Sequence, residues 1–451
     1  MKHLRHLLAL LLIVLVAAPV SAAPPNVVIL LSDDHAWTDY GFMGHDTIQT
    51  PRLDKFAAQS AVFTRGYVPN SLCRPSLATI LTGKYPWQHG IVGNDPRPPA
   101  DATKRPQTPE YFELRTKLVQ QFEKNALLPA LLKDKGYLTM QTGKWWEGHY
   151  SRGGFTEGMT HGDPTKGGRH GDEGLKIGRQ TMQPVFDFVD EAVAKEKPFF
   201  LWYAPMLPHD PHTPPQRLLE KYKAKTDSIH VARYWAMVEW WDETCGRVLD
   251  HLEKKGVADN TIVVYLADNG WIQSIDKPGY APRSKRSQYD GGLRTPIMVR
   301  WPGKVQPTRD DKTLAHSIDV MPTILAACGI AAKEELPGVN LLELCAADFK
   351  KADGRAAKRD IIFGDIHEHD QPAIGNPAPG TTHRWCIEKN YKLILPTEPD
   401  AGSPAAKAGA EPEVELYDVL ADPFEKKNLA REKPQVVADL TKKIDAWWPG
   451  K

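Results

Sequence analysis

Three uninterrupted apolar runs, each followed by polar residues, restrict this chain to a narrow set of folds. They are Asn26–Ser32 (NVVILLS), Phe199–Ala204 (FFLWYA) and Thr261–Ala267 (TIVVYLA). A strand that lacks alternation of apolar and polar residues is buried on both faces, which is typical of parallel strands covered by helices. We therefore predict an α/β fold, a largely parallel sheet flanked by helices.

Amphipathic segments lie between these runs, as such a fold requires. The pattern predicts helices at 53–63, 127–135, 182–194 and 234–254, and further strands at 137–141 and 296–300. Two passages around 93–115 and 151–174 are rich in Pro or Gly and are predicted to be surface loops at the mouth of a pocket. Their Arg and aromatic residues suit an anionic sugar, whereas His161 and His170 are expected to be solvated.

The chain changes character after about residue 350. Strands at 361–366 and 391–395, an Ala/Gly/Pro-rich loop at 400–411 and a terminal helix at 436–447 predict a smaller α+β subdomain. The predicted division is therefore a catalytic domain over 23–350 and a C-terminal subdomain over 351–451.

Residues 1–22 are typical of a cleaved secretory signal peptide. A basic start precedes an apolar core at 7–18, and Val20-Ser21-Ala22 provides small residues for cleavage. An uncleaved anchor is the alternative, but this core is shorter than the roughly 20 residues that a spanning helix needs. We expect an exported protein, periplasmic or extracellular, without stable membrane insertion.

Overall charge identifies no partner, because 57 basic and 56 acidic residues give a net charge of +1. This balance argues against nucleic acid as a partner, so any recognition of anions must be local. Export would place the five cysteines in an oxidising compartment. If Cys73 is set apart, Cys245, Cys328, Cys345 and Cys386 remain. Cys328 and Cys345 are close enough in sequence for a local disulfide, but the pairing of four cysteines cannot be read from sequence.

Polar side chains follow several of the predicted strands. Asp33 and Asp34 follow the first run, and Asp268 and Asn269 follow the last. Carboxyl ends of parallel strands meet at one edge of a sheet, where ligands bind. Four oxygen ligands without thiolate or imidazole clusters suit a hard cation, Ca²⁺ or Mg²⁺.

Basic groups are expected around these oxygens. Lys144 follows the strand at 137–141, the loop after Phe199–Ala204 carries His209 and His212, and Lys285 lies in a basic loop. A divalent ion with two ammonium groups and a histidine suits a doubly charged tetrahedral anion.

Cys73 precedes a Pro-initiated helical run that Gly83 is well placed to end. Its sulfur would lie at a helix N-terminus, which stabilises an anionic nucleophile or a bound oxyanion. A small buried thiol at the start of a core helix is the alternative.

Together these residues form ordered motifs that resemble the type I sulfatases of the alkaline-phosphatase-like superfamily. The matching segments are Asp33-Asp34, Cys73-x-Pro75-Ser76 running to Leu81-Thr82-Gly83-Lys84-Tyr85-Pro86, Gly143-Lys144-Trp145, Pro208-His209, Ala267-Asp268-Asn269-Gly270, Lys285 with Tyr289-Asp290-Gly291-Gly292, and Glu415-Leu416-Tyr417-Asp418 near the C-terminus. The resemblance covers nearly all of the mature chain.

The resemblance implies that Cys73 is oxidised to formylglycine by formylglycine-generating machinery and that its hydrate attacks sulfur. It also implies a metal, Ca²⁺ or Mg²⁺, held by Asp33, Asp34, Asp268, Asn269 and the modified Cys73. Lys144 and Lys285 are then expected on the sulfate oxygens, and His209, in preference to His212, on the leaving oxygen.

Two positions depart from the family pattern. Leu77 stands where the Cys-x-Pro-x-Arg signature has arginine, and Arg74 follows the cysteine directly. We expect Arg74 to contribute to substrate binding. Trp146 replaces the histidine of Gly-Lys-Trp-His, and an indole cannot accept a proton.

These observations favour an exported, Ca²⁺-dependent sulfatase that acts on a sulfated carbohydrate or aryl sulfate. One alternative is a phosphodiesterase or phosphonate monoester hydrolase of the same superfamily with an unmodified cysteine. The other is a catalytically silent protein that binds sulfated glycans.

Overall fold

The computed structural model describes residues 23–99, 107–162, 168–349, 354–397 and 413–450. The predicted signal peptide (1–22), the domain boundary predicted at 350/351 and the loop predicted at 400–411 lie outside the described residues. Within the described part of the chain, no helix combines the length and the apolar character that a membrane span requires.

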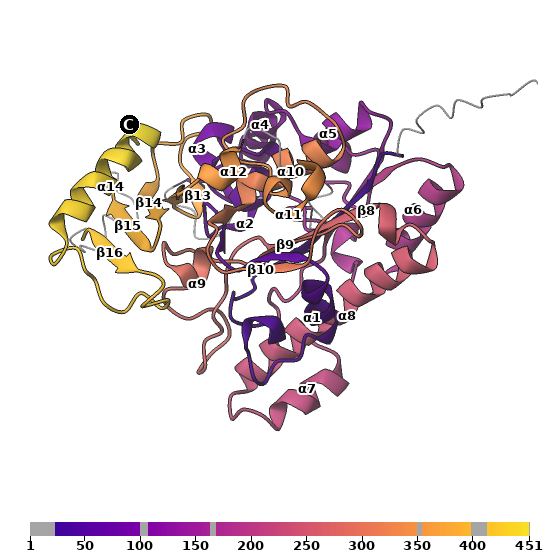
Figure 1. The fold of residues 1–451 in the computed structure, drawn as a ribbon, viewed down its shortest axis with the longest axis horizontal. Coiled ribbons are helices and arrows are strands. Elements are labelled where there is room, and N and C mark those ends of the chain that lie inside the picture. Colours follow the sequence, from indigo (N-terminus) through magenta and orange to yellow (C-terminus); the bar gives the residue numbers. More distant parts are fainter. Residues whose placement is uncertain (1–22, 100–106, 163–167, 350–353, 398–412, 451) are drawn as a thin grey trace, which may run out of the picture.

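An eight-stranded, mostly parallel sheet forms the centre of the larger part of the molecule (Figure 1). Its strands, in order across the sheet, are β10 (Thr308–Asp310), β2 (Ala61–Phe63), β9 (Ile297–Arg300), β8 (Thr261–Ala267), β1 (Asn26–Ser32), β7 (Phe199–Ala204), β5 (Leu138–Gly143) and β6 (Glu157–Gly158). Strand β9 is antiparallel to both neighbours, and the other pairs are parallel. The predicted α/β class is confirmed, and the three apolar runs are β1, β7 and β8.

Helices cover both faces of this sheet (Figure 1). The first face packs against α2 (Cys73–Thr82), α4 (Pro109–Glu123), α5 (Leu128–Lys133), α10 (Val320–Ala327) and α11 (Leu342–Cys345). The second face packs against α1 (Pro51–Ala58), α6 (Gln183–Ala194) and α8 (Ile229–Lys254). Helix α7 (Gln216–Lys223) lies against α8.

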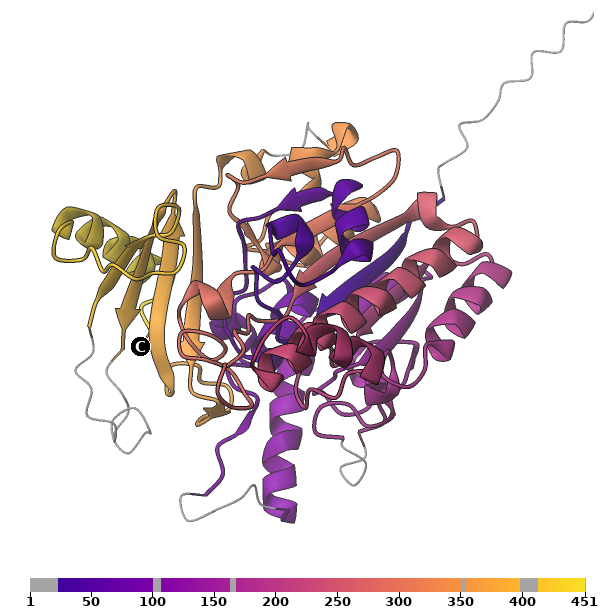
Figure 2. The same cartoon turned by 90° about the horizontal axis from the view of Figure 1, so that it is seen from below.

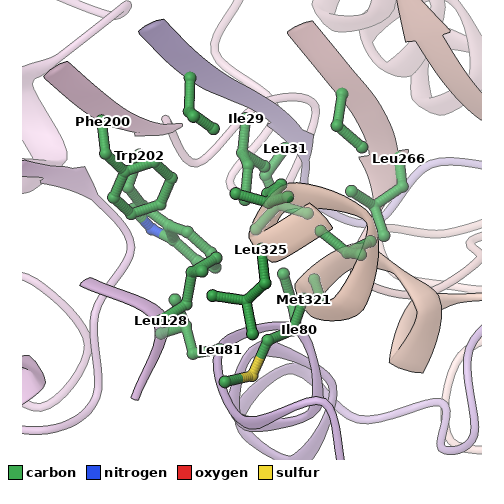
Figure 3. Close-up of a cluster of buried hydrophobic side chains, with 14 of the residues drawn as sticks. Ile29, Leu31, Ile80, Leu81, Leu128, Phe200, Trp202, Leu266, Met321 and Leu325 are labelled. Carbon is green, nitrogen blue, oxygen red and sulfur yellow. The ribbon is translucent and has the colours of Figure 1, made fainter. Parts of the chain in front are cut away.

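The two cores explain why the strands are apolar throughout. In β1, Val27, Ile29 and Leu31 face the first core, whereas Val28 and Leu30 face the second. Figure 3 shows the first core, in which Ile29, Leu31, Phe200, Trp202 and Leu266 lie above α2 and α10. Neither face of β1 contacts water, so its sequence has no reason to alternate apolar and polar residues.

The C-terminal part of the chain forms a smaller antiparallel sheet. Its strands, in order across the sheet, are β12 (Ile361–His367), β14 (Thr381–Glu388), β15 (Tyr391–Pro396) and β16 (Glu415–Asp418). One face packs on the larger part, and the other is covered by α14 (Pro434–Trp447). Figures 1 and 2 show this sheet and α14 at one end of the molecule. The predicted C-terminal α+β subdomain is thereby confirmed.

Short elements complete the described structure. They are β3 (Gly66–Tyr67) paired with β11 (Ala315–His316), β4 (Asp95–Pro96) paired with β13 (Asp370–Gln371), α3 (Pro86–His89), α9 (Asp290–Leu293) and α12 (Arg355–Lys358). The β4–β13 pair joins the larger part of the chain to the segment that follows β12.

The predicted helix at 53–63 is wrong in its last turn. Helix α1 ends at Ala58, and Ala61–Phe63 forms β2 between β9 and β10. Side chains of this short strand are buried against both layers, so tertiary packing outweighs the local helical pattern.

The surface loop predicted at 93–115 is wrong from Pro109 onward, where α4 begins. Pro109 occupies the first helical turn, and the Thr108 hydroxyl accepts a hydrogen bond from the Tyr111 N–H. Tyr111, Leu118, Val119 and Phe122 form the buried side of α4. Strands β14 and β16 were also not anticipated, since their sequences are interrupted by polar residues.

Candidate active site

The predicted site residues converge at the carboxyl ends of β1, β5, β7 and β8. Asp33 and Asp34 follow β1, Lys144 follows β5, and Asp268 and Asn269 follow β8. These strands are parallel neighbours in the sheet, so the residues after them share one edge. His209, Lys285 and Cys73, at the start of α2, complete a group that we call the strand-end cluster.

Four members of the strand-end cluster could share one ion. Ligand atoms of Asp33, Asp34, Cys73 and His209 all lie within 4.8 Å of one another. Asp34 has a φ of 61°, in the left-handed region that is uncommon for a residue other than glycine. Such a backbone strain is often retained where a side chain must be aimed at a site.

Asp268 and Asn269 are joined to these residues by hydrogen bonds. The Asp34 N–H donates to Asp268 Oδ1 at 3.1 Å, and Asn269 Nδ2 donates to Asp34 Oδ1 at 2.7 Å. Burial and the neighbouring charge of Asp33 raise the pKa of Asp268 well above its usual range. Several acidic groups are thus held together at a cost that a cation would offset.

Two buried oxygens support a cation directly. Asp33 Oδ2 and Asn269 Oδ1 accept no hydrogen bond within the described structure. An unpaired buried acceptor is costly, whereas both oxygen types are preferred ligands of Ca²⁺ and Mg²⁺. The residues present therefore fit a hard divalent ion.

Two lysines, Lys144 buried and Lys285 largely buried, neutralise part of this negative charge. Lys144 Nζ lies 2.6 Å from Asp33 Oδ1 and 3.5 Å from Asp268 Oδ2, and Lys285 Nζ lies 2.7 Å from Asp34 Oδ2. Burial disfavours the ammonium of Lys144, but Asp33, Cys73 and Asp268 outweigh it and raise its pKa. Both side chains therefore present fixed positive charge beside Cys73.

Cys73 is buried at the first position of α2. Burial alone would raise the pKa of its thiol, but Lys144, Lys285 and a hydrogen bond with His209 lower it to about 7. The surroundings thus favour an anion at this side chain, as the position at a helix N-terminus suggests.

His209, not His212, belongs to the cluster. His209 Nε2 lies 3.4 Å from Asp34 Oδ2. Burial opposes its protonation, but Asp33 and Asp34 raise its pKa to about 10. His212 instead packs against Tyr234 and Trp271, with ring centroids 5.5 and 5.7 Å away, and burial lowers its pKa to about 4.

The Arg74 guanidinium is paired with Glu147. Its Nε and Nη2 donate to the two Glu147 oxygens at 2.7 and 2.5 Å, and both side chains are buried. Its backbone N–H donates to Asn94 Oδ1 at 2.9 Å. Leu77, at the family's arginine position, packs in the first hydrophobic core.

His170 is a residue that sequence reasoning missed, and the expectation that it is solvated is wrong. Its ring lies edge-on to Trp146 at 5.3 Å, and its Nδ1 is buried without a hydrogen-bond partner in the described structure. Burial, then Arg169, Lys144 and His209, lower its pKa to about 3. A neutral imidazole thus borders the cluster beside Trp146, whereas His161 is exposed as expected. No spacing in the Gly-rich segment marks this position.

The remaining cysteines are separate from the site. All five cysteines of the chain are free, so no bridge joins Cys328 and Cys345. Burial raises the pKa of the Cys245, Cys345 and Cys386 thiols. Only Cys73 has a lowered pKa among them, which sets it apart chemically.

Two family models and several known proteins are similar to this chain. A family model described as sulfatase matches residues 25–330, and one described as N-sulphoglucosamine sulphohydrolase, C-terminal, matches residues 280–447. Human N-acetylgalactosamine-6-sulfatase is 29% identical over 357 residues, which cover 70% of this chain and 65% of that protein. Human arylsulfatase A is 26% identical, over 92% of this chain and 86% of that protein.

A solved structure shares the fold. BT4656, in complex with its substrate D-glucosamine-2-N,6-O-disulfate, has a TM-score of 0.68 and 20% identity, and the match covers 95% of this chain and 99% of that one. At this identity the likeness shows a common architecture and not a common substrate.

Proposed function

This chain belongs to the sulfatase family, and on that premise we propose that it hydrolyses the sulfate ester of a sulfated carbohydrate, with residue 73 as the nucleophile. The convergence of Asp33, Asp34, Cys73 and His209 within 4.8 Å is the observation that carries this proposal. The names of relatives that act on sulfated amino sugars, and the disulfated glucosamine bound to BT4656, support a glycan substrate.

We assign a divalent ion, Ca²⁺ or Mg²⁺, to Asp33, Asp34, Asp268 and Asn269, with residue 73 beside it. When bound, the ion would supply positive charge that polarises the nucleophile and the sulfate oxygens. Formylglycine at residue 73 would supply the attacking hydroxyl. The unpartnered oxygens of Asp33 and Asn269 support this ligand set.

The chain's own residues have distinct tasks in this proposal. Lys144 and Lys285 bind the sulfate oxygens and stabilise the charge that develops on them. Each ammonium is oriented by a carboxylate in advance, so little reorganisation is needed when substrate binds. His209, beside the Cys73 sulfur, protonates the leaving oxygen.

We also propose that the protein is exported to the periplasm or outside the cell and that formylglycine-generating machinery acts on Cys73. The signal-like residues 1–22 support export. The intact Cys73-x-Pro75 start of the signature supports modification, and Leu77 is the feature that makes a direct test necessary.

Peptide mass spectrometry on residue 73 provides that test. Protein from a host that makes formylglycine should carry the aldehyde or its hydrate at residue 73 and should release sulfate from 4-nitrophenyl sulfate or a sulfated amino sugar. Cys73→Ala should do neither. An unmodified thiol in protein that still releases sulfate would refute formylglycine as the attacking group.

A phosphodiesterase or phosphonate monoester hydrolase is the second candidate. The thiol pKa of about 7 favours it, because such a group could act without modification. Parallel assays with bis(4-nitrophenyl) phosphate and 4-nitrophenyl sulfate distinguish the two candidates. Binding of a sulfated glycan without turnover of either ester would instead indicate a silent binder.

A further inference from the structure

A cavity of about 330 Å³ lies beside the strand-end cluster. Arg74, Phe112, Arg115, Trp146, His149 and Arg152 contribute to its lining. We propose that this cavity binds a second anionic group, a carboxylate or a sulfate, of the same oligosaccharide whose sulfate ester is cleaved at residue 73. This inference rests on the proposed function and specifies its substrate class as a glycan with at least two anionic groups.

The cavity adjoins the strand-end cluster through two residues. Arg74 follows Cys73 directly, and Trp146 lies two positions after Lys144. The Trp146 ring meets His170 at its edge and carries the Arg169 guanidinium 4.6 Å from its centroid. Trp146 therefore lines the cavity and contacts His170, which borders the cluster.

Several ion pairs with arginine lie around the cavity. Four guanidinium groups meet three carboxylates there, among the described residues. The pairs are Arg74 with Glu147, Arg152 with Glu123 and Arg169 with Asp95. Asp95 is shared, because it also lies 4.0 Å from Arg115 Nε. Arg115 therefore has the longest of these ion pairs.

Arg115 is well suited to hold an anion. Its side chain is only 20% exposed, yet its guanidinium makes no hydrogen bond within the described structure. Burial lowers its pKa; the charge of Asp95 opposes this effect, whereas the like charges of Arg74 and Arg169 add to it. A bound carboxylate or sulfate would supply the missing acceptors, since both match the planar donor fork of arginine.

The cavity walls suit a sugar residue as the carrier of this anion. Phe112 and Trp146 are aromatic, whereas Arg74 and Arg152 contribute polar atoms that are already held in place. A volume near 330 Å³ lies at the lower end of small-molecule sites. A simple aryl sulfate that occupies the strand-end cluster would leave this cavity unused.

The test compares substrates that differ only in the second charge. The substrates are disaccharides of a sulfated hexosamine and a uronate, the same compounds with the carboxylate reduced to an alcohol, and versions with a second sulfate in its place. The wild type should have a KM about tenfold lower for either doubly charged form than for the reduced form. Arg115→Gln should remove this difference and leave kcat unchanged, because the lost contact is remote from the reacting atoms.

Lys117→Gln is the matched control. Lys117 lies on the same helix, is 53% exposed and pairs with Glu113 outside the cavity. It should leave every KM unchanged. Arg115→Lys keeps the positive charge but lacks the planar guanidinium donors. It should retain part of the lower KM for doubly charged substrates, which would show that the loss in Arg115→Gln is not caused by misfolding.

Equal KM values for charged and reduced disaccharides in the wild type would overturn the second anion site and leave the sulfatase proposal intact. If no ester is hydrolysed, the proposed function fails and the same disaccharides are titrated by calorimetry. Tighter binding of the charged forms that depends on Arg115 would then still support the site, and binding that is independent of Arg115 would overturn it.

Discussion

This molecule contains two clusters of buried acidic and basic side chains that differ in what their charged groups contact. The strand-end cluster lies at the edge of the large sheet. A junction cluster, defined by Asp290 on α9, Lys392 on β15 and Glu425 before α14, lies where the C-terminal sheet meets the larger part. Each contains a residue other than glycine with positive φ, Asp34 at 61° and Glu425 at 55°.

The junction cluster pairs its charges with one another. Lys392 Nζ lies 2.8 Å from Asp290 Oδ1 and 2.7 Å from Glu425 Oε1, and the Asp290 N–H donates to Glu425 Oε2 at 2.6 Å. The Tyr67 hydroxyl donates to Asp290 Oδ2. Here one cation is shared by two carboxylates that come from different segments, which is a structural arrangement.

The strand-end cluster leaves acceptors open. Asp33 Oδ2 and Asn269 Oδ1 have no donor in the described structure, and Cys73 lies among them. Burial of charge therefore does not by itself indicate function. Glu425 Oε1 of the junction cluster also accepts no hydrogen bond in the described structure, although Lys392 Nζ lies 2.7 Å from it. The distinguishing feature of the strand-end cluster is a nucleophile, Cys73, that is held among carboxylates able to share an ion with it.

The largest expected effect is on activity at Cys73. Cys73→Ala should lower sulfate release by at least about 1000-fold, because it removes the attacking group. The melting temperature should change little, since the substitution removes one sulfur atom from the edge of the first core. Cys345→Ala makes the same substitution at a buried thiol outside the cluster and should keep wild-type turnover. Turnover by Cys73→Ala above a tenth of the wild type would exclude residue 73 as the nucleophile.

Lys392→Met tests the other side of the comparison. It leaves Asp290 and Glu425 buried without a cation and should cost about 3–5 kcal/mol in the free energy of unfolding, measured by urea denaturation. Lys443→Met removes a 45% exposed partner of Glu388 from the C-terminal subdomain and should cost less than about 1 kcal/mol. Equal losses for the two variants would mean that the junction cluster contributes no more than a surface pair.

Calcium should stabilise the protein through the strand-end cluster alone. At about 100-fold excess over its Kd, the ion should add about 2.7 kcal/mol to the stability of the wild type, visible as a thermal shift that a chelator reverses. Asp268→Asn should abolish this shift, because it removes a charged ligand without changing shape. Asp365→Asn alters a buried acid on β12 and should keep the shift. A full calcium response in Asp268→Asn would show that the ligands are wrongly assigned.

The smallest effect on kcat is expected at His170. This variant tests whether the functional site extends beyond the strand-end cluster. His170→Ala should lower kcat about tenfold, since it removes the imidazole that borders Lys144 and His209 beside Trp146. His161→Ala changes an exposed histidine of the same segment and should have no effect. The measurement is sulfate release at saturating substrate. Identical kcat values for both variants would exclude His170 from the site.

Much of the fold could be predicted because its physical cause is local. Asn26–Ser32, Phe199–Ala204 and Thr261–Ala267 are strands as predicted, since a strand between two helical layers needs apolar side chains on both faces. The polar residues after them were predicted to gather because parallel strands end at a common edge. Helix α4 was missed because its Pro109 start and sparse apolar face resemble a loop.

The departures from the family pattern could not be interpreted without the structure. Arg74 could have turned toward Cys73 or away, and only the position of Glu147, 73 residues later, decided that it pairs there. Leu77 could equally have lined a pocket, but it packs in the core. His170 had no marker at all.

The sequence by itself determined the layered α/β architecture and the set of strand-end oxygens and cations, because apolar continuity and strand polarity are properties of single segments. Only the tertiary structure decided which buried charges pair with one another and which lie beside the nucleophile. Hydrogen bonds and ion pairs at Arg74, Arg115, His170 and Lys392 depend on segments that are distant in sequence and meet only when the chain folds.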